Sequence, residues 1–143
     1  MNTYFVTVAG NIGAGKTALT RLLSERLGWE PFFEAVSDNP YLADFYRDMR
    51  AWAFHSQIFF LSRRLRHLRQ LLSHPSSVIQ DRSVYEDAEI FARNLYMQGH
   101  MSERDWNTYR ELYEAMISFL PPPDLVIYLR ASVPTQLERI ARR

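Results

Sequence analysis

Apolar residues follow two alternating patterns along this chain. Short runs rich in β-branched and aromatic residues predict buried strands. These runs cover residues 4–9, 29–34, 78–81 and 124–129. Longer stretches with an apolar stripe predict helices. They cover residues 16–27, 40–50, 51–72, 85–98, 102–119 and 132–143. Strands that alternate with helices indicate a layered α/β fold around a parallel sheet.

Turn and capping residues support these boundaries. The first helix carries Leu19, Leu22, Leu23 and Leu27 on one stripe and stops at Gly28. Pro40 can open a helix, and the sequence His74-Pro75-Ser76 ends the long one. Ser102 and Asp105 have the spacing of a capping box. Pro134 suits the first turn of the last helix.

Composition limits the class of protein. The 143 residues suffice for one domain, and 47% hydrophobic with 23% charged residues is ordinary for a soluble globular protein. The formal net charge of +1 favours neither nucleic acid nor an anionic membrane as partner. There is no cysteine, no basic leader and no apolar run long enough to cross a bilayer. We therefore expect a cytoplasmic protein.

The strongest motif follows the first predicted strand and fits G-x-x-x-x-G-K-[ST] in full. It consists of Gly10, Asn11, Ile12, Gly13, Ala14, Gly15, Lys16 and Thr17. In such a loop the backbone N–H groups and the helix N-terminus surround phosphates, the lysine faces the β- and γ-phosphates, and the threonine hydroxyl can bind Mg²⁺. A glycine turn with an incidental lysine is the simpler explanation, but the preceding strand and following helix favour the loop. We expect ATP and Mg²⁺ as cofactors.

The rest of the chain excludes several classes of phosphate-loop protein. GTPases need N-K-x-D and D-x-x-G motifs, and neither occurs. Transport-type ATPases carry a later glycine-rich signature, whereas only 5 glycines are present here. Gly10, Glu34 and Asp81 all fall at predicted strand ends, the edge where α/β folds bind ligands. A small-molecule kinase remains.

At this point the chain resembles the deoxynucleoside kinase family, and most of all its bacterial deoxyadenosine and deoxyguanosine kinases. The matching stretches are GNIGAGKT, FFEAV, NPYLADFY, WAFHSQ, DRSVYEDA and DLVIYLRAS, in the family's order and spacing. Ala35 departs from the family's usual proline, and family members continue past the position of Arg143. The resemblance implies a three-layer P-loop kinase sandwich, with a central parallel sheet flanked by helices, and a homodimer.

The resemblance also implies catalytic roles. Glu34 would be the general base for the nucleoside 5′-hydroxyl, and Arg82 would stabilise the transferring charge beside Lys16. Asp81 and Thr17 would lie on the Mg²⁺ side. Taken alone, Glu34 could be a surface carboxylate, and the Asp-Arg-Ser stretch could be a strand-end ion pair.

A nucleoside pocket is implied on the long helix and its neighbours. Its residues would be Tyr46 at the sugar, Trp52 and Phe54 as walls, and Gln57, Arg64 and Asp87 at the base. Phe54, Gln57, Leu61 and Arg64 share one helix face by their spacing, although core packing explains the aromatic residues equally well. The other arginines of the helix (Arg63, Arg66 and Arg69) suit a solvated face. His55 is expected to pack, and the four histidines lack metal-ligand spacing.

The end of the chain leaves alternatives open. Arg139 and Arg143 match the first lid arginines that clamp phosphates, or they form a basic helix end. The expected unit is a single kinase domain, residues 1–143, that lacks the C-terminal lid and last strand. Purine deoxynucleosides are the favoured substrates, with a role in nucleotide salvage. The alternatives are another P-loop nucleoside monophosphate kinase and a truncated, non-catalytic nucleotide-binding module.

Overall fold

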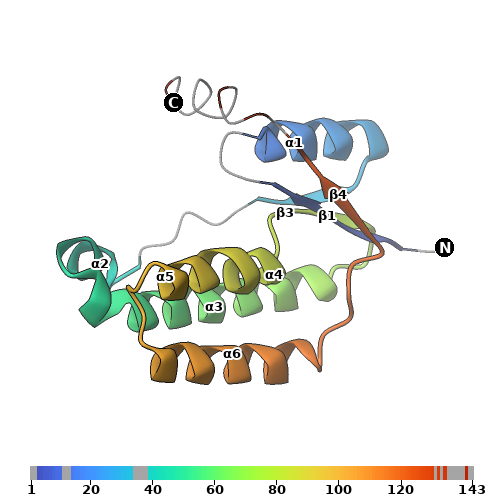
Figure 1. The fold of residues 1–143 in the computed structure, drawn as a ribbon. Coiled ribbons are helices and arrows are strands. Elements are labelled where there is room, and N and C mark those ends of the chain that lie inside the picture. Colours follow the sequence, from blue (N-terminus) through green and yellow to red (C-terminus); the bar gives the residue numbers. More distant parts are fainter. Residues whose placement is uncertain are drawn as a thin grey trace. The chain divides into compact units, whose positions relative to one another are not determined.

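A computed structural model describes residues 3–10, 14–33, 39–130, 132, 134 and 141 (Figure 1). The chain divides into two compact units. One comprises Met1–Ala35, Gln70–Ser83 and Pro122–Arg143, and the other comprises Val36–Arg69 and Val84–Pro121. Each unit draws on separated segments, so the single domain expected from the sequence stays a prediction. We call them the sheet unit and the helical unit.

The sheet unit contains a parallel sheet with the order β2-β3-β1-β4. Its strands are β1 (Phe5–Ala9), β2 (Glu30–Phe32), β3 (Val78–Asp81) and β4 (Leu125–Tyr128). In the register of the two central strands, Val8 pairs with Asp81. Both of these strands are almost wholly buried, which explains their continuous apolar runs. The α/β class predicted from the alternating pattern is confirmed.

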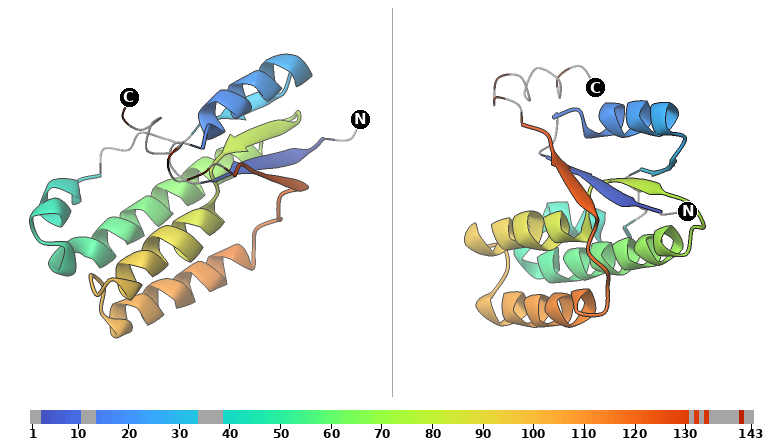
Figure 2. Two further views of the ribbon diagram at one scale, coloured as in Figure 1. Left: turned by 45° about the horizontal axis from the view of Figure 1, so that its top comes forward. Right: turned by 90° about the vertical axis from the view of Figure 1, so that its right-hand side faces the viewer.

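Helix α1 (Lys16–Leu27) covers one face of this sheet (Figures 1 and 2). Val6, Val8 and Ile79 form the core beneath it, and Leu19 and Leu23 pack against them. The predicted apolar stripe is only partly correct, because Leu22 and Leu27 are exposed in the described structure. The helix stops at Gly28 as predicted, with φ of 69° in the left-handed region that glycine tolerates.

Strand β4 is not the buried strand that its sequence predicted. Leu125, Val126 and Tyr128 are each more than half exposed. Within the part of the chain that the structure describes, β4 pairs with β1 along one side only and forms an edge of the sheet. The prediction that this strand is buried rested on its apolar residues alone. The burial of a strand also depends on its position in the sheet, and β4 lies at an edge.

The helical unit begins with two helices, and the boundary between them differs from the one that the sequence predicted at residue 50. They are α2 (Leu42–Arg47) and α3 (Met49–Leu72), whose last turn belongs to the sheet unit. Asp48 separates them with an extended backbone, φ −149° and ψ 90°. The predicted helix 40–50 is therefore shorter, and the long helix starts earlier.

The remaining helices follow β3. They are α4 (Val84–Glu86), the π-helix η1 (Asp87–Ala92), α5 (Arg93–Met97) and α6 (Glu103–Ile117). Ser102 caps α6 as predicted, because its Oγ accepts a hydrogen bond from Asp105 N at 3.1 Å. Helices α5 and α6 lie side by side (Figure 2). None of the helices in the described ranges combines the length and apolar character that a bilayer crossing requires.

Candidate functional site

The described part of the phosphate loop shows why glycine is needed at its first position. Gly10 follows β1 with φ of 151°, and a Cβ built on it would approach the Leu129 carbonyl oxygen to 2.8 Å. Any other residue would force backbone apart at this turn. The structure also describes Ala14, Gly15, Lys16 and Thr17 of the motif, whereas Asn11, Ile12 and Gly13 lie outside the described residues.

Lys16 lies at the first position of α1 and is buried. Its Nζ donates a hydrogen bond to the Gly10 carbonyl at 2.7 Å, which holds the ammonium group against the first residue of the motif. The first turn of α1 contributes its unpaired N–H groups and positive dipole end at the same place. A positive charge and a helix N-terminus together make an anion site.

The two predicted metal ligands lie against each other. Thr17 Oγ1 donates to Asp81 Oδ2 at 2.7 Å, and Asp81 is only 1% exposed. One residue comes from the start of α1 and the other from the carboxyl end of β3, so the parallel sheet brings them together. Hydroxyl and carboxylate oxygens suit Mg²⁺, which commonly uses few protein ligands together with phosphate oxygens and water. This donor set therefore fits the ion.

Arg82 has a feature that sequence reasoning missed. Its backbone has φ of 72°, in the left-handed region that costs a non-glycine residue of order 1–3 kcal/mol. The backbone N donates to the Val8 carbonyl at 2.9 Å, which fixes this conformation at the end of β3. The residue type carries no signal of such strain, because arginine is not enriched in left-handed positions.

Three predicted phosphate-side residues lie outside the described residues: Glu34, Arg139 and Arg143. The described chain reaches Phe33, immediately before Glu34. The Arg21 guanidinium lies 5.6 Å from the centre of the Phe33 ring, so α1 contacts the end of this segment.

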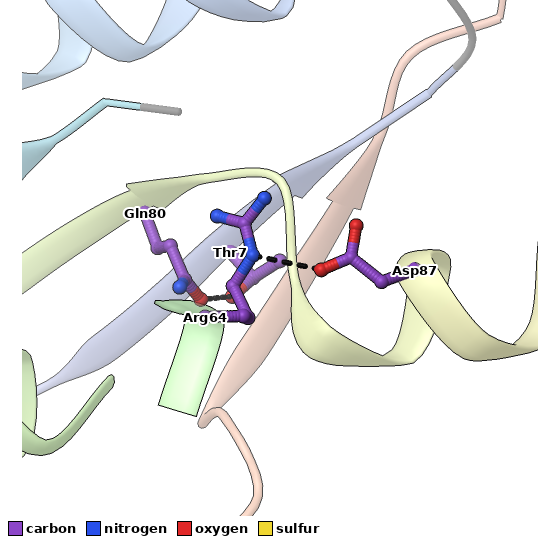
Figure 3. Close-up of polar contacts among 4 residues, drawn as sticks. All are labelled: Thr7, Arg64, Gln80 and Asp87. Carbon is purple, nitrogen blue, oxygen red and sulfur yellow. Dashed lines mark hydrogen bonds and ion pairs between the residues drawn. The ribbon is translucent and has the colours of Figure 1, made fainter. Parts of the chain in front are cut away.

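In the helical unit, Arg64 and Asp87 form a buried ion pair (Figure 3). Arg64 Nε donates to Asp87 Oδ2 at 2.9 Å, and the two side chains are 9% and 7% exposed. Helix α3 supplies the arginine, and the first residue of the π-helix supplies the carboxylate. The second contact in Figure 3 belongs to the sheet unit, where Thr7 Oγ1 donates to Gln80 Oε1 at 3.2 Å.

Two titratable side chains near this pair, Tyr109 and His67, have shifted pKa values. Burial raises the pKa of the Tyr109 hydroxyl, and the negative charge of Asp87 raises it further. Burial likewise lowers the pKa of His67, with the positive charge of Arg64 as a second cause. Both shifts favour the neutral forms of these two neighbours.

The residues of α3 that their spacing predicted to share one face are all buried or half-buried. Gln57, Leu61 and Arg64 are buried, and Phe54 is half-buried. Trp52 is also half-buried and stacks on Tyr41 with ring centres 5.8 Å apart. The arginines of this helix that were expected on a solvated face are exposed: Arg63, Arg66 and Arg69.

Two further residues complete the local picture. Tyr46, on α2, is 70% exposed, and its ring centre lies 5.5 Å from that of Phe45. His55 packs against aromatic rings, with the Trp52 ring centre 5.0 Å away. In the described ranges no group of three or more His, Cys, Asp or Glu side chains could hold a metal ion. Sequence reasoning gave no separate role to Asn39, which it named only within the NPYLADFY stretch, although the residue is buried.

Comparison with known proteins places these residues in a family context. The family model described as deoxynucleoside kinase matches residues 6–143. A deoxyadenosine/deoxycytidine kinase from Bacillus subtilis is 43% identical over 96% of this chain and 64% of its own length. A deoxyadenosine kinase from Dictyostelium discoideum is 40% identical over 96% of this chain and 56% of its own length.

A solved structure gives the same result in three dimensions. Deoxyadenosine kinase from M. mycoides, with products dCMP and dCDP bound, superposes with a TM-score of 0.84 at 35% identity. The match covers 97% of this chain and 70% of that one. The chain thus spans 64% and 56% of the two curated relatives named above. Since the family model matches nearly all of its residues, this chain belongs to the deoxynucleoside kinase family.

Proposed function

We propose that this protein transfers the γ-phosphate of ATP to the 5′-hydroxyl of a deoxynucleoside. The observation that carries the proposal is the contact of Thr17 with Asp81, beside Lys16, at the carboxyl ends of two parallel strands. Family membership supports it, and a solved relative from M. mycoides was determined with dATP bound.

On the phosphate side, the loop of residues 10–17 binds the triphosphate. Lys16 neutralises charge on the β- and γ-phosphates, and Arg139 and Arg143 grip the phosphates from the end of the chain. Thr17 and Asp81 would hold Mg²⁺, and the ion would neutralise charge on the phosphate oxygens. The protein thereby positions and neutralises the phosphates, the main requirement of phosphoryl transfer.

The chemical step needs a base and a charge-stabilising group. Glu34 takes the proton of the 5′-hydroxyl while the hydroxyl oxygen forms a bond to the γ-phosphorus. The bond between the γ-phosphorus and the oxygen that bridges it to the β-phosphate breaks, which releases ADP. Arg82 stabilises the charge on the transferring group. The planar guanidinium suits this role, because it can donate two parallel hydrogen bonds to phosphate oxygens.

On the nucleoside side, Gln57 offers both a donor and an acceptor to the base edge. Arg64 and Asp87 complete base recognition, Tyr46 binds the sugar, and Trp52 and Phe54 form the walls. Purine deoxynucleosides are the proposed substrates, because several relatives are deoxyadenosine and deoxyguanosine kinases.

The wider setting is part of the same proposal. We place the enzyme in nucleotide salvage in the cytoplasm, as a homodimer and as a single kinase domain, without nucleic acid or membrane partners. A nucleoside monophosphate kinase would need an arginine set for a second phosphate and would give Tyr46 and Gln57 no role.

A substrate panel tests the proposal. The protein is incubated with ATP, Mg²⁺ and either each of the four deoxynucleosides or each of the four deoxynucleoside monophosphates, and the products are separated by chromatography. We expect monophosphate products from deoxynucleosides, purines ahead, and none with Lys16→Ala. Diphosphate products from the monophosphates would favour the other kinase class. ATP binding without any product would favour a non-catalytic module.

A further inference from the structure

Asn39, three residues before α2, uses the two ends of its buried side-chain amide for different contacts. Its Oδ1 accepts a hydrogen bond from Tyr41 N at 2.9 Å, which shapes the turn that opens the helix. Its Nδ2 donates to Ser56 Oγ at 3.1 Å, and more weakly to the Ser56 carbonyl at 3.4 Å. Asn39 and Ser56 are 8% and 1% exposed, so these bonds are shielded from water.

An aromatic contact reinforces this connection. The Tyr41 ring stacks on Trp52, with ring centres 5.8 Å apart, and lies 5.6 Å from the His55 ring. The turn before α2 is therefore attached to one stretch of α3 by a polar contact and by ring packing. All of these residues belong to the helical unit.

The two helices joined here carry residues with different proposed partners. Helix α2 carries Tyr46 for the sugar, and α3 carries Gln57, next to Ser56, for the base. A nucleoside has a nearly fixed separation between its sugar and its base edge, so the two side chains need a fixed spacing. Helix α2 has only 6 residues and cannot hold itself in place, since isolated helices of this length are unstable.

We propose that Asn39 is a positioning residue that fixes α2 to α3 and so sets the spacing between Tyr46 and Gln57. This inference rests on the proposed function of those two residues. Asparagine suits the place because it both accepts and donates. Aspartate would keep the acceptor for the turn, but it cannot donate to the Ser56 carbonyl and would place a carboxylate in this buried position. Alanine would lose both contacts.

Nucleoside and nucleotide binding, measured separately by calorimetry, test the proposal. Asn39→Asp and Asn39→Ala should each weaken deoxyadenosine binding roughly tenfold, the effect of losing a buried hydrogen bond, and leave the ATP dissociation constant within about twofold. Ser56→Ala, which removes the closer acceptor, should give a smaller effect of the same kind. The Ser56→Ala variant provides the same test if the Asn39 variants do not fold.

The matched control is Ser24→Ala. It deletes a hydrogen bond of similar kind in the sheet unit, from Ser24 Oγ to the Trp29 carbonyl at 2.7 Å. It should leave deoxyadenosine binding unchanged even if it lowers the melting temperature. Equal losses for the control and the Asn39 variants would reduce Asn39 to a contributor to stability and overturn the inference.

A double-mutant cycle separates positioning from local stability. Tyr46→Phe should weaken deoxyadenosine binding in the parent protein but have little further effect in Asn39→Ala, because the hydroxyl is no longer held in place. Amide hydrogen exchange in α2 should also be faster in Asn39→Ala without ligand. If the effects of the two substitutions were additive and amide exchange in α2 were unchanged, this inference would be overturned while the proposed function would stand. Failure of the parent to bind any deoxynucleoside would overturn the proposed function and, with it, this inference.

Discussion

At the residue scale, the backbone of Arg82 is the clearest sign of a functional constraint. It is the one non-glycine residue with a positive φ among those that the structure describes. Glycine would adopt this conformation without steric cost. An arginine at a strained position, directly after the buried strand that ends in Asp81, supports the proposed role of its side chain.

Two substitutions of Arg82 separate its side chain from its backbone. Arg82→Gly and Arg82→Ala both remove the guanidinium, so kcat should fall strongly in each. The glycine variant relieves the strain, partly offset by its greater freedom when unfolded, and should be about 1 kcal/mol more stable than the alanine variant. Denaturant unfolding of both proteins measures this difference. An alanine variant as stable as the glycine variant would show that the backbone is not strained.

The buried pair of Arg64 and Asp87 should matter for stability as well as for base choice. Asp87→Ala leaves a guanidinium buried without its carboxylate and should cost about 3–5 kcal/mol. Activity should also shift among the four deoxynucleosides rather than fall equally. Glu114→Ala breaks the exposed contact with Arg110 (3.8 Å) and should cost under about 1 kcal/mol. Equal losses with all four substrates would make the buried pair purely structural.

In the proposed mechanism, the chemical step depends on Glu34. Glu34→Gln keeps the size of the side chain but cannot accept the 5′-hydroxyl proton. We expect kcat to fall by about 10²–10⁴-fold, with a much smaller change in nucleoside affinity. Steady-state kinetics and calorimetry give the two quantities. A kcat within a few-fold of the parent would assign the base to another group.

At the element scale, the turn from β1 into the phosphate loop depends on close backbone approach. Gly10→Ala should destabilise the protein and weaken ATP binding, because the new Cβ would lie 2.8 Å from the Leu129 carbonyl oxygen. Gly28→Ala is the matched control: it also has a positive φ, but nothing lies within 4 Å of its Cβ. It should cost about 1–2 kcal/mol of stability and leave ATP binding intact. Similar ATP affinities in both variants would contradict the role of this turn.

The sequence predicted the elements that have a strong periodic signal and missed those set by single backbone positions. The central strands, α1 and α6 were evident from apolar runs and from the Ser102 cap. The break at Asp48 and the π-helix from Asp87 had no such signal, because one extended residue or a wider turn hardly changes the apolar pattern. The exposure of Val126 depends on which strand lies at the edge of the sheet, and a strand's own residues do not record that.

At the scale of the whole molecule, the two groups of site residues differed in predictability. The phosphate loop is contiguous in sequence, so spacing alone indicated its chemistry, and the fold then brought Asp81 to Thr17. Arg64 and Asp87 are 23 residues apart on separate helices, and only the family resemblance connected them beforehand. Asn39 escaped notice because its partner Ser56 is identified only once α2 and α3 are folded together.

The central claim is transfer of the γ-phosphate to a nucleoside 5′-hydroxyl. The most direct measurement uses ATP carrying ¹⁸O in its γ-phosphate, with deoxyadenosine as acceptor and mass spectrometry of the product. We predict a labelled monophosphate whose fragments place the phosphate at the 5′ oxygen, and no such product with Lys16→Ala. Labelled inorganic phosphate with no nucleotide product, or the same product from the Lys16→Ala protein, would contradict the assignment.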